Sequence, residues 1–145
     1  MRIVFGLGVA AMALASCSQP KELSVDGAWV RLGAVTGQPA AAYFTVHGGP
    51  APATLISVTT DVAIKAEMHE TMDKGGMSTM APIAKVEIPA NTDVSFAPSG
   101  RHVMLFSMNS GIKPGDRVML TFAFADGTRI LNNANVVAAG TPAGK

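Results

Sequence analysis

The chain has little cysteine and little charge. Its 145 residues contain one cysteine, Cys17, so no disulfide can form within the chain and its stability must come from a hydrophobic core. Asp, Glu, Lys and Arg make up 14% of the residues and form neither a basic stripe nor an acidic run. The absence of a basic stripe argues against a nucleic-acid partner, and the absence of an acidic run argues against a store for hard cations.

The longest apolar run is too short to span a membrane. It extends from Ile3 to Leu14, twelve residues against the about 20 that a spanning helix needs, and it follows Arg2. This is typical of a signal peptide. The next residues, Ala15-Ser16-Cys17, complete a sequence that resembles the bacterial lipobox. We therefore predict a lipoprotein signal peptide over residues 1–17, with Cys17 lipidated; the alternative is an ordinary signal peptide that is removed together with this cysteine.

The mature chain is predicted to be a single exported domain on a short tether. Without residues 1–17 it has ten basic and ten acidic side chains. We expect a tether over residues 18–23, a domain over 24–138 and a flexible tail over 139–145. The lipid would hold the domain against a membrane, facing the periplasm or the cell exterior. Ser18 after the cysteine favours the outer membrane over the inner one in a host with two membranes.

Short alternating segments separated by Gly, Pro, Asn and Asp predict an all-β fold, and no long amphipathic helix is visible. In the clearest example, Val118, Leu120, Phe122 and Phe124 alternate with more polar residues. Such strands favour an immunoglobulin-like two-sheet β-sandwich. The expected strands are Val25–Arg31, Ala41–His47, Thr54–Thr60, Ala63–Thr71, Ala84–Ile88, Val94–Ala97, His102–Ser107, Arg117–Phe124 and Arg129–Val137.

Four potential metal ligands stand in the order His-x10-Met-x21-His-x-Met: His69, Met80, His102 and Met104. Each alone is usually a surface or packing residue, but two thioethers with two imidazoles favour Cu(I). Residues two apart on a strand share a face, which places the last two within about 7 Å of each other. A hairpin turning at Gly75-Gly76 could bring the first two together.

Other methionines leave the first half of this site open. Met77 could replace Met80 if the loop folds differently, although the spacing favours Met80. Met72 could be an entry ligand. Met68 would point away from the ligand face and is expected in the core.

Neighbouring residues have possible supporting roles. Glu70 and Asp73 could orient His69 through its second ring nitrogen, although a simple solvated role is equally compatible with the sequence. His47 lies on the more polar face of its strand and is not expected to be a ligand. Trp29 is expected to be a core anchor, and an aromatic ring near a Cu(I) site could also shield it.

The ligand spacing is similar to that of the periplasmic copper chaperones called PCuAC, and the likeness covers roughly residues 24–137. The matching segments include Met68-His69-Glu70-Thr71, Met80-Ala81-Pro82-Ile83 and Pro98-Ser99-Gly100-Arg101-His102-Val103-Met104-Leu105. The resemblance implies a cupredoxin-like β-sandwich that binds one Cu(I) per chain. It also implies delivery of copper to an extracytoplasmic acceptor, the CuA site of a respiratory oxidase, directly or through a Sco-like thiol protein. The tail lacks the His- and Met-rich extension of some members, which puts a second site for Cu(II) in doubt.

Several other functions compete with that of a monomeric chaperone. An electron-transfer cupredoxin needs a cysteine ligand inside the domain, and Cys17 lies outside it. No Ser-His-Asp set, Cys-His pair or carboxylate pair indicates an enzyme. A copper-sequestering or tolerance lipoprotein, and a metal-free interaction lipoprotein, remain as alternatives.

Overall fold

The computed structural model describes residues 20–143, which form ten strands and no helix. The strands are β1 (Ser24–Arg31), β2 (Ala40–His47), β3 (Ala53–Thr59), β4 (Ala63–Lys74), β5 (Met77–Pro82), β6 (Val86–Ile88), β7 (Asp93–Phe96), β8 (Arg101–Met108), β9 (Arg117–Phe124) and β10 (Arg129–Val137). The predicted all-β fold is confirmed, and β5 is the one strand that was not predicted. The predicted signal peptide, Cys17 and the start of the predicted tether lie outside the described residues.

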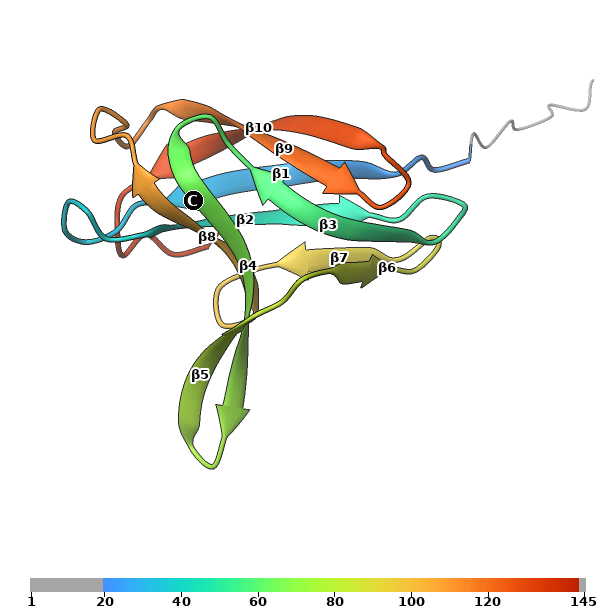
Figure 1. Cartoon of the computed structure of the whole chain (residues 1–145), viewed down its shortest axis with the longest axis horizontal. Coiled ribbons are helices and arrows are strands. Elements are labelled where there is room, and N and C mark those ends of the chain that lie inside the picture. Colours follow the sequence, from blue (N-terminus) through green and yellow to red (C-terminus); the bar gives the residue numbers. More distant parts are fainter. Residues whose placement is uncertain (1–19, 144–145) are drawn as a thin grey trace, which may run out of the picture.

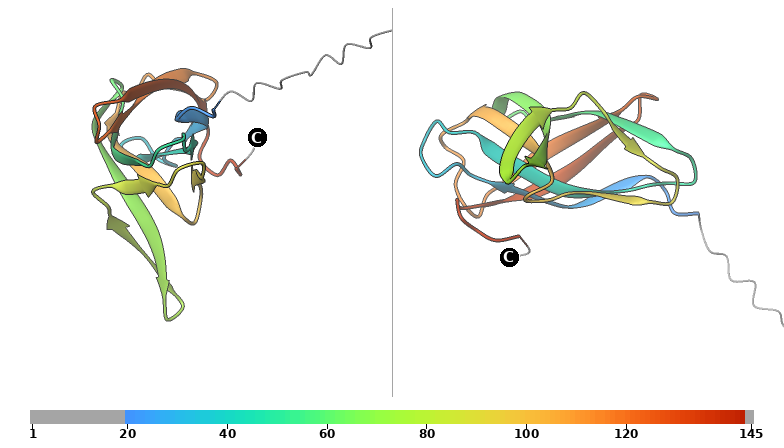
Figure 2. Two further views of the ribbon diagram at one scale, coloured as in Figure 1. Left: turned by 90° about the vertical axis from the view of Figure 1, so that its right-hand side faces the viewer. Right: turned by 90° about the horizontal axis from the view of Figure 1, so that it is seen from below.

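Hydrogen bonds join the strands into one sheet in the order β5-β4-β8-β2-β1-β10-β9-β3-β6. β2 pairs with β8 through its first residues and with β7 through its last ones, so the sheet branches along β2. The sheet curls back on itself to enclose the core (Figures 1 and 2). The predicted β-sandwich is confirmed, and its two layers are joined into one hydrogen-bonded sheet by strands that they share. No helix in the described part of the chain is long and apolar enough to cross a membrane.

The core is built from the inward faces of these strands. The alternation predicted for β9 is confirmed: Val118, Leu120, Phe122 and Phe124 are buried, and Arg117 is exposed. Three phenylalanine side chains make ring contacts in this core. The Phe44 ring stacks on Phe96 with 4.3 Å between centroids and meets the edge of Phe122 at 4.7 Å.

A β-bulge in β1 changes which side chains face outward. The register with β2 shifts between Asp26 and Trp29, and Gly27 within this interval has a φ of 63°. Such a left-handed residue is typical of a bulge, and the extra residue reverses the in-out phase of the rest of the strand. Trp29 and Arg31 therefore point to the outer face. The sequence had predicted Trp29 as a core anchor, but its side chain is half-buried on this outer face.

β4 and β5 form an arm that projects from the body of the domain (Figure 1). The pairing of β4 with β8 ends at Glu70, and its pairing with β5 begins at His69. We call residues 71–82 the arm; none of them is buried. Gly75 and Gly76 make the predicted turn at its tip, with φ values of 58° and 80° that suit a two-residue hairpin turn.

Candidate metal site

The structure places the four predicted ligands on one face of the sheet. His69 on β4 is paired directly with His102 on β8, and Met104 lies two residues further along β8. Thr71, two residues beyond His69, is paired with Met80 on β5. Directly paired residues share a face, and so do residues two apart on one strand. All four side chains therefore leave the sheet on its outer side.

Three of these four side chains line one surface hollow, and the fourth, His69, lies next to His102. Met80, His102 and Met104 line a cavity of about 320 Å³, together with Arg31 and other residues. The His69 ring stands beside it, 5.8 Å from the His102 ring between centroids. The arm contributes Met80 and the body contributes the two residues on β8, so the hollow lies where the arm leaves the body.

His102 is buried, with 6% of its surface exposed, and the structure orients its ring. Its Nδ1 lies 3.2 Å from the Gly100 carbonyl oxygen, which also accepts a hydrogen bond from the Thr71 backbone N–H at 3.2 Å. A carbonyl only accepts, so Nδ1 carries the proton and Nε2 keeps a free lone pair. Burial lowers the pKa of His102, more than the Gly100 carbonyl raises it. The ring is therefore neutral near pH 7, as metal binding requires.

His69 is oriented by Glu67 on the same strand. Its Nε2 lies 3.2 Å from Glu67 Oε2, and Lys65 Nζ lies 2.6 Å from the other carboxylate oxygen. The hydrogen bond from Lys65, and then the one from His69, lower the pKa of Glu67. An ionised carboxylate only accepts, so Nε2 is the donor. The Nδ1 atom of His69 is buried and has no hydrogen-bond partner among the described residues.

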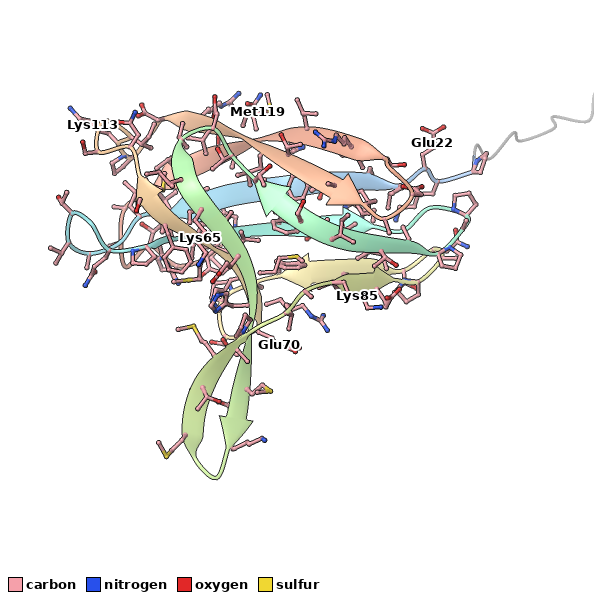
Figure 3. All side chains as sticks on the ribbon, viewed as in Figure 1. Glu22, Lys65, Glu70, Lys85, Lys113 and Met119 are labelled. Carbon is pink, nitrogen blue, oxygen red and sulfur yellow. The ribbon has the colours of Figure 1, made fainter. Side chains whose placement is uncertain are left out.

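The sequence had suggested Glu70 and Asp73 as residues that could orient His69, but in the structure both bind other partners. Glu70 lies at the base of the arm, as labelled in Figure 3, and pairs with Arg101 at 3.5 Å. Asp73 accepts a hydrogen bond from the Ser78 hydroxyl on β5. Glu67 has the position that Glu70 lacks, because a residue two away from His69 shares its face and an adjacent residue does not.

The strand register separates Met80 from the other methionines nearby. Met72 pairs with Thr79, and Met77 pairs with Lys74, so both leave the arm on the face opposite Met80. Met77 is 70% exposed and Met80 is 60% exposed. Met68 is buried in the core, as predicted.

An aromatic pair and a cation adjoin the hollow. The guanidinium of Arg31 donates to the Tyr43 hydroxyl at 2.8 Å and lies 5.3 Å from the centre of that ring. Trp29 packs against Tyr43 with 4.5 Å between ring centroids. Sequence reasoning missed Arg31 and Tyr43. The bulge in β1 turns Arg31 to the ligand face, and the pairing of Ala41 with Met104 places Tyr43, two residues further along β2, on the same face.

His47 lies apart from these residues, at the other end of β2. Its two ring nitrogens each lie 2.8 Å from a carboxylate, Nε2 from Asp26 and Nδ1 from Asp93. The hydrogen bond to Asp26, and then the one to Asp93, raise the pKa of His47. Both nitrogens can donate only in the charged imidazolium, so this histidine forms ion pairs and offers no lone pair to a metal.

Within residues 20–143, no three or more His, Cys, Asp and Glu side chains are grouped so as to hold a metal ion. The thioethers of Met80 and Met104 lie on the same face as His69 and His102. Thioether sulfur is a soft ligand, which selects for Cu(I) over the hard cations.

The sequence is similar to a family and to a protein that are both described as putative lipoproteins. The family model described as "Putative lipoprotein LpqE-like" matches residues 23–136. "Putative lipoprotein Lxx21020" of Leifsonia xyli subsp. xyli (strain CTCB07) is 30% identical over 132 residues, which is 87% of this chain and 79% of that protein.

Solved structures share the fold. The solution structure of CuI-DR1885 from Deinococcus radiodurans is 28% identical, with a TM-score of 0.68 over 84% of this chain and 83% of that one. The copper-bound PCuAC domain from PmoF2 is 19% identical, with a TM-score of 0.66 over 83% of this chain and 98% of that one; at that identity it supports the fold alone. The chain therefore belongs to the LpqE-like family, and the PCuAC-type domain predicted from its sequence is confirmed.

Proposed function

We propose that this protein is a copper chaperone that binds one Cu(I) per chain through His69, Met80, His102 and Met104. The observation that carries the proposal is the direct pairing of His69 with His102 across β4 and β8, with both thioethers on the same face. The 28% identity to CuI-DR1885, which was solved with Cu(I), also supports it. The proposed domain spans residues 24–138.

The chemistry of these ligands suits a donor. Four neutral ligands leave the charge of Cu(I) uncompensated, and the Arg31 guanidinium adjoins the same hollow. A nearby cation disfavours a divalent ion more than a monovalent one. Thiolates are softer and negatively charged, so a dithiol protein should hold Cu(I) more tightly than this site does. Copper then moves from this protein to such an acceptor by ligand exchange.

The proposed acceptor lies outside the cytoplasm. The candidates are the CuA site of a respiratory oxidase, reached directly or through a Sco-like thiol protein. Lipidation at Cys17 would keep the chaperone at a membrane surface; the description of the matching family as lipoproteins supports this. Outer-membrane placement remains the prediction from Ser18.

A Cu(I) titration against a competing chelator tests the binding step. We expect one equivalent to bind to the mature chain. Replacing either histidine by Gln, or Met80 or Met104 by Leu, should weaken binding by about tenfold or more, which corresponds to about 1.4 kcal/mol. His47→Gln is the matched control and should bind as the wild type does. Unchanged affinity in all four ligand variants would refute the assigned site.

A transfer experiment separates a chaperone from a copper store. Copper-loaded protein is mixed with an equal concentration of an apo dithiol acceptor, and the two are then separated and analysed for metal. The chaperone proposal expects this chain to be emptied. Retention of copper would instead support sequestration or tolerance as its role. Cys17→Ser should abolish membrane fractionation in the native host, and unchanged fractionation would argue against the lipid anchor.

A further inference from the structure

His69 and His102 offer different ring nitrogens to the site. On His102, the Gly100 carbonyl occupies Nδ1 and leaves Nε2 free. On His69, the Glu67 carboxylate occupies Nε2, and the remaining nitrogen, Nδ1, is buried without a hydrogen-bond partner. A buried polar atom that lacks a partner destabilises the fold, so such an atom in a native structure requires an explanation.

Both carboxylate oxygens of Glu67 have a partner, one of which is His69. Its second oxygen is paired with Lys65, whose ammonium also lies 5.3 Å from the centre of the Phe106 ring. Its backbone is paired directly with Met104 on β8, so the carboxylate stands on the ligand face beside the proposed site. Side chains that fix the second nitrogen of a ligating histidine select its tautomer and its orientation.

We propose that Glu67 is a positioning residue that keeps His69 in the Nε2–H tautomer, so that His69 binds Cu(I) through Nδ1 while His102 binds through Nε2. The copper part of this inference rests on the proposed function. Nδ1 is bonded to Cγ, whereas Nε2 is at the far side of the ring. The ion would therefore lie closer to the backbone of β4 than to that of β8. This position is nearer to Met80, because β5 adjoins β4.

The tautomers can be measured without copper. Long-range ¹H–¹⁵N correlation spectra of the ¹⁵N-labelled apo protein distinguish the two neutral forms of a histidine ring. We expect the Nε2–H form for His69 and the Nδ1–H form for His102. The Nδ1–H form at His69 would overturn the proposal.

Three variants assign the effect to the Glu67 side chain. Glu67→Ala removes the acceptor, so His69 should become a mixture of tautomers and Cu(I) affinity should fall about 10–100-fold, as for other partners of metal-bound histidines. Glu67→Gln keeps an oxygen that can accept from Nε2, and it should restore the tautomer and most of the affinity. Glu70→Ala is the matched control on the adjacent residue and should change neither.

The copper-loaded spectrum tests which atom binds. Addition of Cu(I) should shift the ¹⁵N resonance of Nδ1 in His69 and of Nε2 in His102. A shift at Nε2 of His69, or a Glu67→Ala variant with wild-type tautomer and affinity, would refute the proposal while leaving the copper site itself intact. If the wild type bound no Cu(I), the proposed function would fail along with the Nδ1 assignment, and the apo tautomer would still test the role of Glu67 independently.

Discussion

The body of the domain and the arm are held together by different means. The body surrounds side chains such as Phe44, Leu120 and Phe122, which are almost fully buried. The arm has no buried residue between 71 and 82, and it depends on the hydrogen bonds between β4 and β5. Figure 3 shows the contrast, with side chains crowded in the body and few around the arm. The proposed site combines both regions: three ligands lie on strands of the body, and Met80 comes from the arm.

A substitution in the core should have the largest effect on the free energy of unfolding, and this effect should distinguish the body from the arm. Phe122→Ala removes a ring that contacts Phe44 at 4.7 Å, and we expect it to lower the free energy of unfolding by about 3–5 kcal/mol. Met77→Ala, at a 70% exposed position in the arm, should change this free energy by less than about 0.5 kcal/mol. Chemical denaturation followed by circular dichroism measures both. Equal losses would mean that the arm contributes to the cooperative core.

The methionines of the arm provide the next test. Met80→Leu preserves size and should weaken Cu(I) binding by about tenfold, whereas Met77→Leu should change it by less than about twofold. The physical reason is the register, which places Met77 on the face away from His69. Competition titrations of the two variants give the comparison directly. A larger effect from Met77 would mean that the arm pairs differently when copper is bound.

Shortening the arm tests whether its tip is needed. Residues 73–78 are replaced by Asn-Gly, which favours a two-residue turn, keeps Met72 and Thr79 as the pair that flanks the turn, and leaves Thr71 opposite Met80. Because the removed residues are exposed, unfolding should change by less than about 1 kcal/mol and Cu(I) affinity by less than about threefold. The same two titrations measure this variant. A loss of copper binding comparable to that of Met80→Leu would assign a role to the tip.

The smallest expected effect is a pH dependence of stability that arises from His47 in the body. The folded state raises the pKa of His47 through Asp26 and Asp93, so its ion pairs stabilise the fold below the ordinary value of 6.5. This contribution is lost as pH rises through the folded-state pKa. The stability difference between the wild type and His47→Gln should therefore be greater near pH 6 than near pH 9, by less than about 1 kcal/mol because the pairs are largely exposed. A difference that grew with pH would contradict this assignment.

The sequence predicted the body better than the arm for a physical reason. Strands such as β9 alternate between buried and exposed residues, so their hydrophobic pattern is visible in the sequence. No residue of β5 is buried, so its sequence has no such pattern, although the Gly75-Gly76 turn indicated a hairpin. The four proposed ligands are recognisable from their spacing. Glu67, Arg31 and Tyr43 were missed, because their place beside the site depends on register and on the bulge at Gly27.

The direction of β1 has a consequence for how the protein meets its partners. This strand begins at Ser24, next to the predicted tether, and ends at Arg31 beside the hollow, about 23 Å away for a strand of this length. A lipid on Cys17 would thus attach the domain by the end remote from the proposed copper ligands. The ligand face would be free to turn toward a water-soluble domain of an acceptor, and delivery would require no approach to the bilayer surface.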